Sequence, residues 1–161
     1  MPSYTIHLAV AAEYLKHHEE DDEQSFLKGV LAPDFLPKPA SHYGPASSLC
    51  RPDLFLLEQV LADGYRRGYY LHLLTDKLFY SLMVDMTAFS KEIYRDYDKL
   101  NARLIDRYAL EIPDYARPTL SFLEGEPLIL SEERLYRFIK AVGLVGIHDA
   151  DAEEKVKNAL L

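Results

Sequence analysis

Two residues near the middle of the chain, His72 and Asp76, have the spacing of a metal-binding pair. On a helix, side chains four residues apart project from one face, so an imidazole and a carboxylate at this spacing can reach one cation. Such donors suit zinc, and also manganese or iron. A lone pair of this type is more often a surface hydrogen bond, but leucines surround this one, and burying an unpartnered carboxylate is costly. We therefore expect Asp76 to bind a metal ion.

Three further residues, His7, Asp34 and His42, are candidate ligands. Asp34 follows Pro33, where a helix is expected to stop, and His42 lies in the proline-rich loop predicted for residues 34–52. Taken singly, Asp34 is more typical of a cap or turn, and His42 of a surface loop. His7 belongs to the first turn of a predicted helix, on an apolar face where a histidine is more often a core residue than a ligand.

The elements that must position these residues are helices, because apolar residues recur at helical spacing and strand-period alternation is nearly absent. Gly68, one turn before His72, leaves room for a ligand or for a neighbouring backbone. Helices are predicted from Ile6 to Leu15, from Phe26 to Leu31 with Pro33 ending or bending the second, over 53–62, 64–83 and 86–108, from Ser131, and from about Asp151 onward. The sequence therefore predicts an all-α, single multi-helix domain over residues 1–161.

Composition restricts the class of protein. With 48% hydrophobic and 27% charged residues among 161, the chain has the balance of a globular domain. The net charge of -8, without any Lys/Arg cluster, argues against binding to nucleic acid or to anionic membranes. Neither a transmembrane segment nor a signal peptide is recognisable, so we expect a cytoplasmic protein. Nothing in the sequence indicates an oligomeric state.

In four ordered blocks the chain resembles the zinc-dependent phospholipase C family: TIHLAVA, FLKGVLAPDF, SHYG and GYYLHLLTD, over roughly residues 4–80. That family is all-helical and related in fold to the single-strand-specific zinc nucleases. The resemblance implies that Asp34, His42, His72 and Asp76 surround one metal ion. It also implies that Asp76 bridges to a second ion, which His7 binds as well.

The chain departs from this family after the fourth block. Family enzymes complete a three-metal site with further histidines and a His-x-x-x-Glu pair, whereas this sequence has no histidine between Asp76 and His148. We therefore expect a site of one or two zinc ions, with manganese or iron as alternatives. Asp96, in the segment DYDKLN, borders an apolar stripe and could supply a replacement ligand.

The leading hypothesis for function is a metal-dependent hydrolase of a small phosphoester, such as a phospholipid head group, a nucleotide or another phosphodiester. In this scheme Asp34 is either a fourth ligand or the catalytic base that orients the attacking water. One alternative is a non-catalytic helical protein with a structural or vestigial metal, which the missing later ligands favour. Another is an HD-like nucleotide phosphohydrolase, which requires His148 and Asp149 to lie beside His72.

Overall fold

The structure is a computed structural model that describes residues 3–37, 63–84, 91–145, 147 and 149–161. Within these residues the protein is all-helical, as predicted. The helices are α1 (Tyr4–His17), α2 (Glu23–Phe35), α4 (Gly64–Leu82), α5 (Glu92–Tyr108), α6 (Glu132–Leu144) and α7 (Ala152–Ala159), with a short 3-10 helix η3 (Arg117–Thr119) between α5 and α6. The helix predicted over 53–62, and the start of the one predicted over 86–108, lie outside the described residues.

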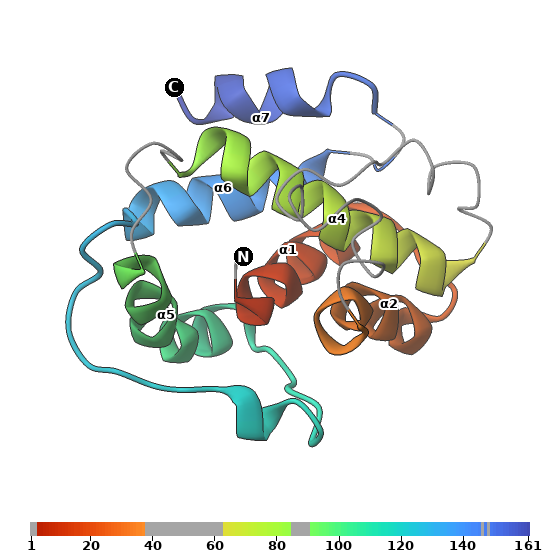
Figure 1. Cartoon of the computed structure of the whole chain (residues 1–161). Helices are drawn as coiled ribbons and strands as arrows, with labels where there is room; N and C mark the ends of the chain where they lie inside the picture. The colour runs from red at the N-terminus through yellow and green to blue at the C-terminus, as the bar shows by residue number, and fades with distance from the viewer. Residues whose placement is uncertain (1–2, 38–62, 85–90, 146, 148) are drawn as a thin grey trace.

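Helix α1 runs through the middle of the fold and packs against α2, α4, α5 and α6 (Figure 1). Its composition suits this position, because small and apolar residues occupy nearly all of its faces; Ile6, Ala9 and Val10 are fully buried. Ser3 caps the helix by accepting the N–H of Thr5 with its hydroxyl oxygen. A polar side chain in the first turns of α1, such as His7, is therefore held inside the protein.

A single hydrophobic core joins the described helices. Phe26 of α2, Phe79 of α4 and Phe138 of α6 are all fully buried, and the rings of Phe79 and Phe138 meet edge to face with their centroids 5.7 Å apart. Helix α7 lies across α4 and α6 (Figure 1) and contributes Val156 to the core. No helix in the described part of the chain has the length and apolar character to cross a membrane.

Helices α2 and α4 approach each other closely at two glycines. A Cβ atom added to Gly29 would lie 1.9 Å from the carbonyl oxygen of Tyr65 on α4. One added to Gly68 would lie 2.0 Å from the carbonyl oxygen of Phe26 on α2. Only glycine permits main chains this near to each other. Of the two predicted roles for Gly68, room for a neighbouring backbone is the one that the structure confirms.

Helix α2 continues for two residues beyond Pro33 and ends at Phe35. The prediction of a loop from residue 34 is therefore wrong at its first residues. Proline removes only one N–H from the helical ladder, and the last turn is still closed by the Leu36 N–H, which donates to the carbonyl of Ala32 at 3.0 Å. As a result, a helical turn and not a loop positions Asp34.

Asp96 on α5 is buried, but main-chain amides are its hydrogen-bond partners. Its carboxylate oxygens accept the N–H groups of Leu128, Ile129 and Leu130 at 2.8, 2.6 and 2.9 Å. The expectation that Asp96 supplies a replacement metal ligand is therefore wrong. The carboxylate instead holds the irregular segment before α6 against α5.

Replacing Asp96 with alanine is expected to lower the free energy of unfolding by about 3 kcal/mol, because three N–H groups lose a charged acceptor. Urea denaturation measures this loss. The matched control is Asp106→Ala, an exposed aspartate on the same helix, which should change stability by about 0.5 kcal/mol or less. A loss for Asp96→Ala no larger than that of the control would contradict this role.

Candidate metal centre

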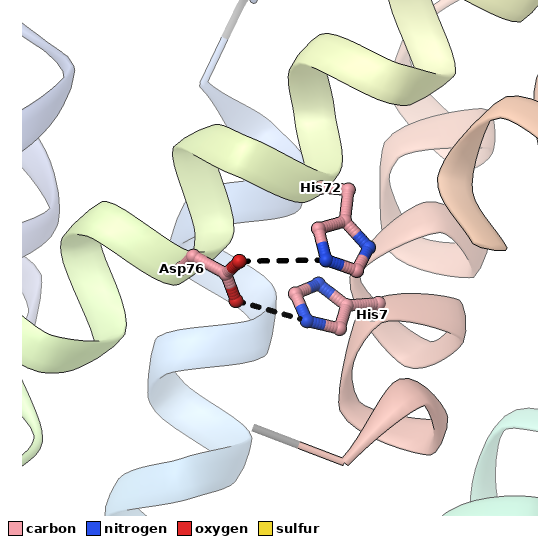
Figure 2. Close-up of side chains that lie close together, drawn as sticks. All are labelled: His7, His72 and Asp76. Carbon is pink, nitrogen blue, oxygen red and sulfur yellow. Dashed lines mark ion pairs between the residues drawn. The ribbon is translucent and has the colours of Figure 1, made fainter. Parts of the chain in front are cut away.

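His7, His72 and Asp76 come together in the core between α1 and α4 (Figure 2). His72 and Asp76 project from one face of α4, as predicted, and both are fully buried. His7 reaches them from α1, and its side chain is equally inaccessible. One nitrogen or oxygen atom from each of the three residues lies within 4.8 Å of the others. The group could therefore hold a metal ion.

The carboxylate of Asp76 presents one oxygen to each imidazole ring (Figure 2). Oδ1 lies 3.1 Å from Nε2 of His7, and Oδ2 lies 3.4 Å from Nε2 of His72. The two rings are stacked, with centroids 3.5 Å apart and planes only 9° from parallel. Because a lone pair of imidazole lies in the plane of its ring, the two Nε2 lone pairs occupy separate, nearly parallel planes. Asp76 thus lies between two Nε2 atoms whose lone pairs do not point toward a common position.

The other ring nitrogen of His72, Nδ1, lies 2.6 Å from the carbonyl oxygen of Val30 on α2. Since a carbonyl only accepts, Nδ1 must carry the hydrogen, which leaves the lone pair of a neutral ring on Nε2. A metal-binding histidine commonly has this second hydrogen bond. No pattern of side chains in the sequence points to Val30, because Val30 acts through its main-chain carbonyl. Nδ1 of His7 has no hydrogen-bond partner within the described part of the chain.

Asp34 lies at the edge of the group, in the last turn of α2. Its Oδ1 atom is 3.6 Å from Nε2 of His72. Its side chain is 14% exposed, whereas those of His72 and Asp76 are 0% exposed. Asp34 is therefore the candidate ligand with the best access to solvent among these three.

The pKa values of the two histidines shift in opposite directions. Burial lowers the pKa of His7, and the neighbouring His72 lowers it further. Burial also acts to lower the pKa of His72, but the carboxylates of Asp76 and Asp34 and the carbonyl of Val30 outweigh it, so this pKa is raised above its ordinary value of 6.5. In the metal-free group the additional proton that charges an imidazole is therefore held more readily by His72 than by His7.

Two residues with predicted roles at the site, His42 and His148, lie outside the described residues, so these roles stay predictions. Asp149, next to His148, accepts the N–H of Asp151 at 2.9 Å and pairs with Lys155 at 2.5 Å. It thus acts at the start of α7. Within the part of the chain that the structure describes, Asp149 does not belong to the group around His72.

A separate groove of about 850 Å³ lies between α1, α2 and the segment from the end of α5 to residue 122. Its walls are mainly apolar and include Leu8, Leu31, Ile112 and Phe122. None of the described candidate ligands lines it. The candidate metal centre is therefore not part of this groove.

Comparison of the chain with protein-family models, with curated proteins and with solved structures finds no match.

Proposed function

We propose that this protein is a metal-dependent hydrolase of small phosphoesters, with zinc as the preferred ion. The observation that carries the proposal is the meeting of two imidazoles and a carboxylate from α1 and α4, with a second carboxylate, Asp34, at the more exposed edge. Such donors are expensive to bury together unless they are hydrogen-bonded or bind a cation. The resemblance of four sequence blocks to the zinc-dependent phospholipase C family supports the same conclusion.

The donor set fits two cations better than one. A single ion midway between the stacked rings of His7 and His72 would lie out of both ring planes, away from both lone pairs. Two ions in the separate ring planes would each take one Nε2 atom and one oxygen of Asp76. The ring separation of 3.5 Å is comparable with the spacing of about 3.5–4 Å between the ions of two-metal hydrolases. When bound, such ions neutralise a phosphate and make a water more acidic.

The residues of the chain have distinct parts in this proposal. His7, His72 and Asp76 hold the ions, and the hydrogen bond from His72 to the carbonyl of Val30 fixes which nitrogen of the ring is the donor. Asp34, which is closer to solvent, either completes the coordination or accepts a proton from the attacking water. His42 is a further proposed ligand outside the described residues. The substrate class is a phospholipid head group, a nucleotide or another small phosphodiester.

One observation favours the alternative of a non-catalytic protein with a structural metal. His7, His72 and Asp76 are each no more than 1% exposed, and a closed site is typical of structural ions. The two functions differ in their consequence for stability, because the binding free energy of a structural ion is part of the free energy of folding.

Metal-dependent turnover tests the proposal. We expect the protein, stripped of metal and then supplied with zinc or manganese, to hydrolyse a chromogenic phosphodiester, and a chelator to stop the reaction. The accompanying decrease in melting temperature should be small, since a packed core already holds the ligands. The absence of turnover with every metal, together with a large decrease on chelation, would reject the hydrolase in favour of the structural ion.

A further inference from the structure

We infer that Gly29 and Gly68 are positioning residues for the metal centre: the close α2–α4 contact that they permit places the Val30 carbonyl against His72 and so holds Nε2 as the ligand atom. This inference rests on the proposed function, because it takes His72 to be a ligand. It adds a role for two residues without side chains of their own, and for a main-chain carbonyl on a different helix.

Contacts between α2 and α4 repeat along successive turns of both helices. Gly68 faces the carbonyl of Phe26, and four residues further along each helix His72 faces the carbonyl of Val30. One more turn along α2 brings Asp34 to 3.6 Å from Nε2 of His72. The glycine contact is therefore one turn away from the hydrogen bond to His72, on the same face of α4.

An added methyl group at Gly68 must move this part of α2. Its Cβ would lie 2.0 Å from the carbonyl oxygen of Phe26 and 3.0 Å from the nitrogen of Val30. Relief of the first contact to about 3.0 Å requires a shift of about 1 Å. Such a shift would lengthen the 2.6 Å hydrogen bond between Val30 and His72 beyond the normal range. The hydrogen could then move to Nε2 and occupy the position of the metal-binding lone pair.

The tautomer of His72 can be read directly in the metal-free protein, labelled with ¹⁵N-histidine, from two-bond ¹H–¹⁵N NMR correlations at pH 8.5. The signals of His72 are identified by their absence in His72→Gln. We expect the wild-type ring to carry hydrogen on Nδ1 and a bare lone pair on Nε2, and Gly68→Ala to lose this pattern. Zinc affinity, measured by competition with a chelator, should fall about ten- to a hundredfold in Gly68→Ala.

Gly143→Ala is the matched control. A Cβ at Gly143 on α6 would lie 2.4 Å from Cβ of Glu13 on α1, so this variant also disturbs a close helix contact, but neither α2 nor His72 takes part in it. We expect Gly143→Ala to lower the melting temperature and to keep both the wild-type tautomer and a zinc affinity within about threefold of wild type. An equal loss of affinity in the two glycine variants would show a general packing effect and overturn the inference.

The inference and the proposed function can fail separately. Hydrogen on Nε2 of His72 in the wild-type protein would overturn the inference even if Gly68→Ala proved unable to fold. A folded Gly68→Ala variant with the wild-type tautomer and wild-type zinc affinity would overturn it as well. A wild-type protein with the expected tautomer that binds no zinc would instead refute the proposed function, and the positioning of His72 would stand.

Discussion

Replacement of His72 by alanine is expected to abolish metal-dependent hydrolysis and to weaken zinc binding roughly a hundredfold or more. The imidazole faces both Asp76 and Asp34 through Nε2, so its loss would remove the central proposed ligand of the group. Loss of an outer hydrogen-bonding partner alone typically costs about ten- to a hundredfold in affinity, and loss of a ligand should cost at least as much. Turnover of a chromogenic phosphodiester and chelator competition measure the two effects.

The fold should survive this replacement, because α2 and α4 still meet through Gly29 and Gly68. Circular dichroism should therefore show nearly unchanged helix content. His17→Ala is the control, since His17 is an exposed histidine at the end of α1 and away from the group. Full activity and zinc affinity in His72→Ala would contradict the proposed centre, and so would equal losses in the two variants.

Zinc affinity is expected to depend on pH through His72 alone near pH 6.5. The imidazole must be neutral to bind the ion, and the pKa of His72 is raised, so a proton competes with zinc below this raised value. The pKa of His7 is lowered, mainly by burial and then by His72, so protonation of His7 competes with zinc less than protonation of His72 does. We expect zinc affinity to fall about tenfold for each pH unit below the raised pKa of His72. In that range each zinc ion that binds should release one proton from His72.

Calorimetric titration in buffers of different ionisation enthalpy counts the released protons. Release of two protons near pH 6.5 would show that both histidines are charged in the metal-free protein. An affinity independent of pH from 5.5 to 7.5 would mean that His72 is not a ligand.

The raised pKa of His72 has the opposite effect on the stability of the metal-free protein, which it increases at low pH. A histidine whose pKa is raised by folding stabilises the folded state where it is protonated. The contribution of His72 is therefore fully present below the ordinary pKa of 6.5 and is lost as the pH rises through the higher folded value. Zinc binding should become tighter over the same interval.

Local spacing was sufficient to predict part of the site. His72 and Asp76 are four residues apart on one helix, so their common face depends only on helical geometry. The leucines around them predicted burial correctly, since Leu71, Leu73 and Leu78 are all at most 1% exposed. The placement of His7 beside them was implied only by the family resemblance, because two helices far apart in the sequence must meet to produce it.

The incorrect or missing predictions concern main-chain groups. The acceptor for His72 is a carbonyl, and every residue has one, so no side-chain pattern identifies Val30. Asp96 has the expected position beside an apolar stripe, but its partners are amides more than 30 residues away in an irregular segment. Such pairings depend on the packing of α5 against the segment before α6, which helical periodicity does not encode.

The most direct test of the metal centre is an anomalous diffraction map from crystals of the protein grown with zinc. We expect a zinc peak about 2.0–2.2 Å from Nε2 of His72 and from a carboxylate oxygen of Asp76, with a second peak beside Nε2 of His7 if two ions bind. The identity of the metal follows from data collected on either side of the zinc absorption edge. Peaks confined to exposed histidines such as His17, with no density between α1 and α4, would contradict the account.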